Sequence, residues 1–196
     1  MGRFQYFGYG SNMLTDKLKR KDRCPSAVKI DVARTNEYTL KFHKVSTAVS
    51  DQGIRDESGK GDMAPKESET DELYGVVFSI DDQHKDNLDS AEGVGWGYEE
   101  TKIDVEVKNL IPQHEIDVEG ITKGPLQVVA YKATEKDKDL KPYHWYKGQT
   151  VDGAKEHGLP PDYIKKIEAF ESIQDRDKER VDKETAYKHK SSSNSI

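Results

Sequence analysis

Alternating hydrophobic and polar positions predict β-strands along much of the chain. Residues 3–9 carry aromatic side chains on both faces, a pattern typical of a central strand. Residues 27–34 and 38–42 also alternate, and the turn-like residues between them allow either a hairpin or one bent strand. Residues 72–80 are almost continuously apolar, which makes them the clearest strand in the sequence.

The same patterns predict the later strands and the helices between them. Residues 98–107 alternate with charged positions, as expected of a half-exposed strand, and residues 126–133 predict a further strand. Short helices are expected directly after Asn12 and over residues 81–91. Apolar residues spaced by three and four positions predict an amphipathic helix over 162–173.

Glycine and proline mark the ends of elements and the loops. A helix that follows an aromatic stretch is expected to end at Gly158, just before Pro160. Residues 44–71 contain few apolar positions and predict a long loop, with a short edge strand near residues 61–64. Residues 108–124 predict another loop or an edge hairpin.

The order of these elements indicates the fold class. Strands dominate, helices are short, and strands do not alternate regularly with crossover helices, which favours an α+β fold with a small mixed β-barrel flanked by short helices. We expect one domain over residues 1–174. Residues 175–196 alternate in charge without apolar periodicity and predict a disordered polar tail.

Composition narrows the functional classes. The 196 residues include 35% charged side chains and carry a net charge of −6, which argues against a general nucleic-acid binder. The sequence shows no signal-peptide core and no apolar stretch of bilayer length, so a soluble cytoplasmic protein without a membrane partner is expected. Cys24 is the single cysteine, and it is better explained as a small buried residue than as a nucleophile.

Familiar catalytic motifs do not account for the sequence. The six histidines are scattered singly, so neither a metal site nor a cofactor is expected. There is no nucleophile elbow and no Walker loop, and the glycines at residues 93–97 do not lead into a helix as a dinucleotide motif requires.

Two glycine-rich corners remain as candidate sites. Residues 7–12 join a strand to a helix, where free backbone N–H groups and glycine could bind an oxygen or an anion. An ordinary turn with Ser11 or Asn12 as helix cap explains the same residues. Glu92 stands at the second corner, either as a functional carboxylate or as a solvated charge at a helix end.

Taken together, the two corners resemble the gamma-glutamylcyclotransferase family. The resemblance covers about residues 4–174 and rests on separate motifs that occur in the family's order. These are Tyr9-Gly10-Ser11-Asn12, Glu92-Gly93 followed by Gly97-Tyr98, Tyr146 ahead of Gly153-Ala154-Lys155-Glu156 and Gly158-Leu159-Pro160, with local matches at Pro25-Ser26-Ala27, Val32-Ala33-Arg34 and Glu72-Leu73-Tyr74-Gly75-Val76-Val77. The family fold is a small mixed barrel, as the pattern of elements also predicts.

The resemblance implies a reaction and a set of site residues. A gamma-glutamyl donor attacks its own gamma-carbonyl with its alpha-amine and releases 5-oxoproline and an amine or amino acid, without metal or cofactor. Glu92 would be the general acid and base, with a pKa raised by burial near Trp96. The substrate-binding residues implied are Tyr6, Phe7, Gly8, Tyr9, Gly10, Ser11, Tyr98 and Tyr146. Tyr98 and Tyr146 are equally well explained as core residues.

Several alternatives stay open. The partner is expected to be a small gamma-glutamyl molecule, with gamma-glutamyl amino acids favoured over gamma-glutamylamines. Glutathione ranks lower because the glutathione-specific relatives lack the residue Asn12. A non-catalytic binding module on the same fold is the third option. Residues 59–65 replace an apolar pocket-wall strand of the family, which leaves the leaving group open. The oligomeric state is also open, with a homodimer as one option.

Overall fold

The computed structural model describes residues 2–108 and 125–187 and contains a small barrel with helices around it. The strands are β1 (Arg3–Gly8), β2 (Val28–Thr35), β3 (Tyr38–Val45), β4 (Gly59–Pro65), β5 (Leu73–Asp81), β6 (Tyr98–Val107) and β7 (Pro125–Ala133). The helices are η1 (Ser11–Met13), α1 (Thr15–Leu18), η2 (Asp82–His84), α2 (Lys85–Glu92), α3 (His144–Glu156), α4 (Pro161–Ala169) and α5 (Lys178–Thr185).

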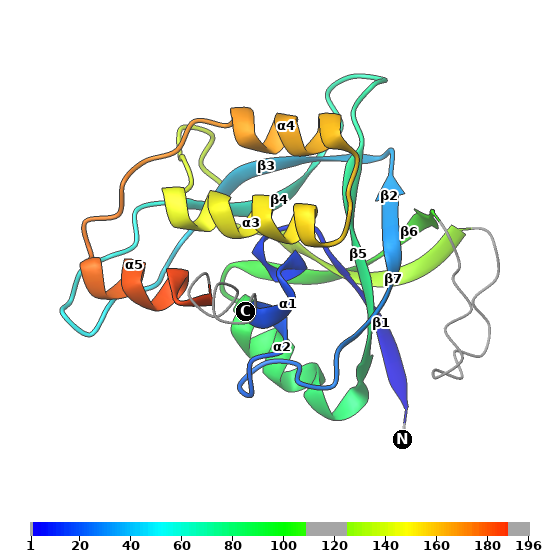
Figure 1. The fold of residues 1–196 in the computed structure, drawn as a ribbon, viewed down its shortest axis with the longest axis horizontal. Coiled ribbons are helices and arrows are strands. Elements are labelled where there is room, and N and C mark those ends of the chain that lie inside the picture. Colours follow the sequence, from blue (N-terminus) through cyan, green and yellow to red (C-terminus); the bar gives the residue numbers. More distant parts are fainter. Residues whose placement is uncertain (1, 109–124, 188–196) are drawn as a thin grey trace, which may run out of the picture.

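Five of the described strands close into a barrel in the order β1-β5-β2-β6-β7 (Figure 1). Neighbouring strands are antiparallel except at the closure, where β1 runs parallel to β7 with Tyr6 opposite Val129. The expected mixed α+β barrel with short helices is therefore confirmed. Strand β5 is buried on both faces along most of its length, which explains its almost unbroken apolar sequence.

Strands β3 and β4 form a separate two-stranded sheet. Of the two alternatives for residues 27–34 and 38–42, the hairpin is wrong, because β2 pairs with β5 and β6 whereas β3 pairs with β4. The expected short strand near residues 61–64 exists as the longer β4. The pairing partner of β3 is thus supplied by the segment that the sequence predicted to be mostly loop.

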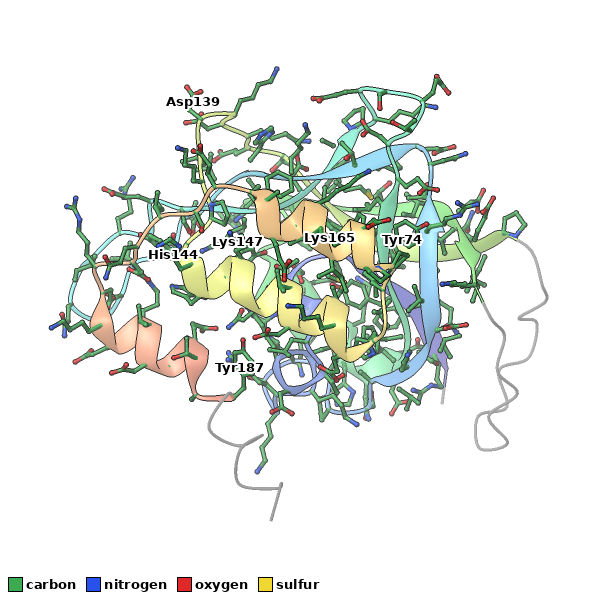
Figure 2. All side chains as sticks on the ribbon, turned by 45° about the horizontal axis from the view of Figure 1, so that its top comes forward. Tyr74, Asp139, His144, Lys147, Lys165 and Tyr187 are labelled. Carbon is green, nitrogen blue, oxygen red and sulfur yellow. The ribbon has the colours of Figure 1, made fainter. Side chains whose placement is uncertain are left out.

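Helices α3 and α4 lie next to each other along one side of the molecule (Figure 1). Lys147 of α3, labelled in Figure 2, donates hydrogen bonds to the carbonyl oxygens of Glu168 and Phe170 at the end of α4. The chain leaves the helix there: Phe170 is extended, and its ring packs against Phe42 at 5.0 Å. Helix α4 is therefore shorter than the predicted 162–173.

The C-terminal segment corrects the predicted disordered tail. Residues 175–187 are ordered around α5, whose N-cap Asp177 accepts a hydrogen bond from the backbone N–H of Arg180. Tyr187, labelled in Figure 2, donates a hydrogen bond to Asp152 of α3. These polar contacts hold residues 175–187 in place, although the sequence of this segment has no apolar face. Residues 188–196, and residues 109–124 of the other predicted loop, lie outside the described part of the chain.

Within the described residues, no helix is long and apolar enough to cross a bilayer.

Candidate active site

Segments far apart in the sequence meet in one pocket of about 290 Å³ beside the barrel. The corner after β1, the end of α2 and the start of β6 contribute most of its wall. Single residues of β4, β7 and α3 complete the wall. The lining residues are Tyr6, Tyr9, Gly10, Ser11, Asn12, Gly61, Glu92, Tyr98, Tyr131 and Tyr146.

Glu92 is the last residue of α2, and Gly93 fixes its position. Gly93 has a φ of 68°, in the left-handed region, and its N–H donates back to the carbonyl oxygen of Ser90. The N–H of Val94 likewise donates to Asp89. The chain therefore turns sharply after Glu92, and the carboxylate is held at the pocket instead of continuing along the helix.

A chain of hydrogen bonds orients the Glu92 carboxylate. The Asn12 amide nitrogen donates to Glu92 Oε1 and to the Tyr6 hydroxyl oxygen, the latter at 3.1 Å. Arg23 donates in turn to the Asn12 amide oxygen at 3.1 Å. Both ends of the Asn12 amide are thus engaged, so its nitrogen is held toward the carboxylate. Asn12 is not a helix cap, since no side-chain cap is present at η1.

Burial raises the pKa of the Glu92 carboxyl, whereas Arg23, Lys17 and Lys44 act in the opposite direction. The raised pKa and its cause, burial, agree with the expectation, but the expected neighbour Trp96 does not supply that burial. Trp96 is 82% exposed, and the surrounding aromatic rings are the pocket tyrosines. A carboxyl that gains a proton more readily than usual suits a group that must both take and return one.

Hydrogen-bond donors converge on the same pocket. In the described part of the chain, the backbone N–H groups of Gly10 and Ser11 have no acceptor. The Tyr6 hydroxyl oxygen accepts from Asn12, so this hydroxyl keeps its own hydrogen for a ligand. The Tyr146 hydroxyl oxygen accepts from the N–H of Gly61 at 3.0 Å, and the hydroxyl is also hydrogen-bonded to the Ser11 side chain. Burial raises the pKa of both phenols, which keeps them protonated.

Two other pocket tyrosines have their hydroxyls committed to the protein. Tyr9 donates to the carbonyl oxygen of Tyr131, and Tyr98 donates to the carbonyl oxygen of Gly61. Their rings form pocket walls, while their hydroxyl groups tie β4 and β7 to the site. Tyr98 thus lines the pocket together with Glu92, but its hydroxyl is bonded to Gly61.

Phe7 and Gly8 do not line the pocket, in contrast to the expectation. Successive side chains of a strand point to opposite faces. Because Tyr6 faces the pocket, Phe7 points into the core, where it is fully buried. Gly8 is still within β1 and packs against the backbone of Asn12. The backbone donors of the corner accordingly begin after the strand, at Gly10.

Comparison with known proteins identifies the family. The model of the AIG2-like family matches residues 72–167. The gamma-glutamylcyclotransferase of Bos taurus is 34% identical over 86% of this chain and 79% of its own length, and that of Homo sapiens is 31% identical over the same shares. The chain belongs to the gamma-glutamylcyclotransferase family. It is therefore an enzyme of this family.

A solved structure of a gamma-glutamyl cyclotransferase supports this membership. It superposes with a TM-score of 0.70 at 28% identity, over 90% of this chain and 92% of its own. The yeast gamma-glutamyl cyclotransferase specific to glutathione shares the fold at a TM-score of 0.57 and 11% identity.

Four residues that line the pockets of this gamma-glutamylcyclotransferase family member were not among the site residues predicted from its sequence. Asn12 stood within the first family motif, so its place there was an available signal. Arg23, Gly61 and Tyr131 lie outside every motif and reach the site only through tertiary structure. Gly61 and Tyr146 are far apart in the chain, so the spacing of residues within a motif does not predict their contact.

A larger outer pocket of about 1020 Å³ opens beside the first one. The two pockets share Ser11, Asn12, Glu92, Tyr98 and Tyr146, so Glu92 stands at their boundary. Charged side chains from β3, β4, α1, α2, α5 and the segments after β3 and α1 line the outer pocket. These are Lys17, Arg23, Lys44, Asp56, Lys60, Arg180 and Glu184, together with Glu92.

Other chemistries find little support in the described residues. No three His, Cys, Asp or Glu side chains are grouped there as metal ligands would be. The Cys24 thiol is fully buried, and burial raises its pKa to about 12, so it stays protonated at neutral pH.

Proposed function

We propose that this enzyme cyclises gamma-glutamyl amino acids to 5-oxoproline and a free amino acid, with Glu92 as general base and general acid. One observation carries the proposal: the Glu92 carboxyl and the free N–H groups of Gly10 and Ser11 share a pocket of about 290 Å³. The names and identities of the relatives support the same reaction class.

The first step uses Glu92 as a base. The alpha-amine of the donor is an ammonium at neutral pH, and the ionised Glu92 takes one of its protons. The freed nitrogen pair then attacks the gamma-carbonyl carbon of the same molecule. Correct orientation alone accelerates such a ring closure, with effective molarities of order ~10⁵ M in good cases. The pocket walls of tyrosine rings would supply this orientation.

The second step uses Glu92 as an acid. The tetrahedral intermediate carries a negative oxygen that the N–H groups of Gly10 and Ser11 would stabilise. The carbon–nitrogen bond to the leaving group breaks as Glu92 returns its proton to the departing nitrogen, and the ring nitrogen then loses its second proton to the freed Glu92 carboxylate. Proton transfer by one positioned carboxyl contributes about 10²–10⁴-fold to rate. Asn12 would hold that carboxyl through both steps.

The hydroxyls of Tyr6 and Tyr146 are the remaining donors of the inner pocket. Both stay protonated because burial raises their pKa. They would bind the alpha-carboxylate of the glutamyl part, which needs donors because no cation lines this pocket among the described residues.

The decisive experiment replaces the carboxyl without changing its shape. Glu92→Gln keeps an oxygen that can accept from Asn12 but cannot exchange protons. We expect 5-oxoproline release to fall at least ~10²-fold, with an unchanged melting temperature as evidence of folding. Glu99→Gln, which removes an exposed carboxylate at the start of β6, is the matched control and should retain activity. Equal rates for the two variants would refute the assignment of Glu92.

A panel of donors separates the alternatives. Gamma-glutamyl amino acids, a gamma-glutamylamine, gamma-glutamyl-lysine and glutathione differ only on the leaving side. If only the gamma-glutamylamine or only glutathione is turned over, that donor replaces gamma-glutamyl amino acids as the proposed substrate. Binding of 5-oxoproline without turnover of any donor would favour a non-catalytic module.

A further inference from the structure

The outer pocket lies where the leaving group must go. Glu92 would protonate the departing nitrogen, and Glu92 stands at the boundary of the two pockets. The glutamyl part fills the inner pocket, so the rest of the donor extends into the outer one. This assignment rests on the proposed function. If it holds, the side chains of the outer pocket determine which leaving groups the enzyme accepts.

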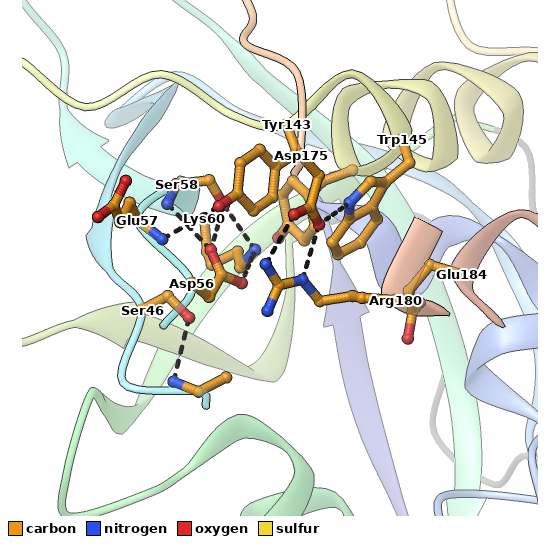
Figure 3. Close-up of polar contacts among 12 residues, drawn as sticks. Ser46, Asp56, Glu57, Ser58, Lys60, Tyr143, Trp145, Asp175, Arg180 and Glu184 are labelled. Atoms are coloured by element: carbon orange, nitrogen blue, oxygen red, sulfur yellow. Dashed lines mark hydrogen bonds and ion pairs between the residues drawn. The ribbon is translucent and has the colours of Figure 1, made fainter. Parts of the chain in front are cut away.

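Two cations of the outer pocket are neutralised by neighbours. Figure 3 shows Lys60 bound to Asp56, at 2.7 Å, and Arg180 held by the carboxylate of Asp175, also at 2.7 Å. Both carboxylates are almost fully buried and therefore hold their partners firmly. Lys60 and Arg180 shape the wall and have little charge to offer a ligand.

A third cation is also occupied. The Lys17 ammonium donates to the Gln149 side chain at 2.7 Å and lies 3.9 Å from Glu184, whose carboxylate it shares with Arg20. This cluster joins α1, α3 and α5 behind the pocket.

Lys44 is different because no carboxylate forms an ion pair with it, although the charge of Glu92 lies near enough to act on it. The residue is only 8% exposed, yet no carboxylate oxygen of the described residues lies within 4.0 Å of its ammonium. The ammonium lies 5.0 Å from the centre of the Tyr98 ring and lines the outer pocket. Burial lowers the pKa of this group, and a bound anion would offset that cost.

The neighbouring backbone is adapted to this position of Lys44. A Cβ atom on Gly97 would lie 2.6 Å from Lys44 Cε and 2.8 Å from its Nζ. Only glycine at residue 97 leaves the ammonium its present place.

Arg23 is a second cation without a carboxylate partner. One of its terminal nitrogens, Nη1, bonds to Asn12, and no ion pair to another described residue uses the rest of the guanidinium. The outer pocket therefore offers two positive charges, one beside Tyr98 and one beside Asn12.

We propose that the outer pocket selects gamma-glutamyl donors whose leaving part carries two carboxylates, with Lys44 as the specificity-determining residue. The leaving part is then an acidic amino acid or a short acidic peptide. Its alpha-carboxylate and its side-chain carboxylate match the two unpartnered cations, whereas a neutral amide side chain leaves Lys44 buried without a partner.

The test compares two donors of the same shape, gamma-glutamyl-glutamate and gamma-glutamyl-glutamine. We expect kcat/KM of the full-length protein to be about tenfold to a hundredfold higher for the acidic donor, the range of one charge-assisted hydrogen bond. The preference should lie mainly in KM. Because both donors use the same Glu92, any general loss of catalytic power cancels in their ratio.

Variants of Lys44 then locate the preference. Lys44→Met should bring the ratio close to one, and Lys44→Arg should restore most of it. Gly97→Ala keeps the charge but displaces the ammonium, so it should also lower the ratio. Lys165→Met removes an exposed lysine of α4, labelled in Figure 2, and should leave the ratio unchanged.

The outcomes separate this inference from the proposed function. Equal kcat/KM for the two donors in the wild-type protein, or an unchanged ratio in Lys44→Met, overturns the selection by charge while the cyclisation stands. The ratio in the wild-type protein decides even if Lys44→Met fails to fold. Absence of 5-oxoproline from every donor overturns the proposed function itself.

Discussion

At the scale of single residues, Asn12 connects every part of the inner pocket. Its nitrogen holds Glu92 and Tyr6, and its oxygen is held by Arg23. A carboxylate at a helix end would otherwise turn toward water, because solvent favours its charged form. The position of Glu92 in the pocket is therefore a property of three side chains and not of one.

The pH dependence of the reaction tests this arrangement. Glu92 must be ionised to act as a base, so kcat/KM rises as pH increases through its raised pKa. The Asn12 hydrogen bond favours the charged form and lowers that pKa. We expect Asn12→Ala to move the acidic limb upward by about one pH unit and to lower kcat roughly tenfold.

Arg23→Met should move the same limb in the same direction, because the guanidinium also lowers the pKa of Glu92. A fall in kcat with an unmoved limb would mean that Asn12 serves folding alone. The measurement is a profile of kcat/KM against pH for the three proteins.

Sequence patterns resolve the site only partly at this scale. Tyr6, Tyr9, Gly10, Ser11, Tyr98, Tyr146 and Glu92 come together at the pocket as the family motifs imply. Their roles remain proposals. Phe7 was included although strand alternation places it opposite Tyr6, and Trp96 was placed near Glu92 although a tight turn carries it into solvent. Spacing along the chain shows that residues are close, but not which way their side chains point.

At the scale of elements, the end of α2 decides where the carboxyl lies. Gly93 ends the helix in a left-handed conformation, and nothing lies within 4 Å of a Cβ placed there. The backbone conformation, not crowding, is what requires glycine at this position. The consequence can be isolated by substitution because no side-chain contact is altered.

We expect Gly93→Ala to lower the free energy of unfolding by about 1–2 kcal/mol, the cost of a left-handed non-glycine residue. Gly93→Asn should cost less, since asparagine tolerates this conformation better. Activity should fall in the same order, because the strain is relieved by shifting Glu92. Denaturant titration and kcat/KM of both variants provide the measurement, and equal effects of the two substitutions would contradict the explanation.

Strong periodicity made most elements predictable. Residues 98–107 form β6 with the expected bounds, since alternation reports burial on one face. Strand β4 was predicted only as a short strand near residues 61–64, and the pairing of β3 was not predicted, because β4 consists of small and polar residues such as Gly59, Asp62 and Pro65. Asp62 is fully buried there only because Lys136, far along the chain, pairs with it.

At the scale of the whole molecule, the C-terminal segment is part of the folded body. Arg180 binds Asp175 with two nitrogens and lies 5.4 Å from the centre of the Tyr143 ring. It also reaches the carbonyl oxygen of Ile54, which ties α5 to the segment between β3 and β4. The sequence predicted disorder here because this segment is charged and lacks apolar periodicity. A local pattern of this kind does not report partners that lie more than a hundred residues away in the chain.

Loss of the Arg180 contacts should release α5 from the folded body. We expect Arg180→Ala to lower the free energy of unfolding by about 2–4 kcal/mol, because it leaves the buried Asp175 carboxylate without its cation. Proteolysis within residues 175–187 should become faster. Arg176→Ala, at an exposed position of the same segment, is the matched control. Unchanged stability and cleavage of Arg180→Ala would show that α5 is held by other contacts.

The parallel closure of the barrel has a consequence during protein synthesis. Strand β1 leaves the ribosome first, yet one of its edges waits for β7, whose Val129 lies opposite Tyr6. An unpaired strand edge can recruit another chain. A nascent or truncated chain that ends before β7 therefore leaves this edge of β1 unpaired and lacks Tyr131 and Tyr146 of the inner pocket.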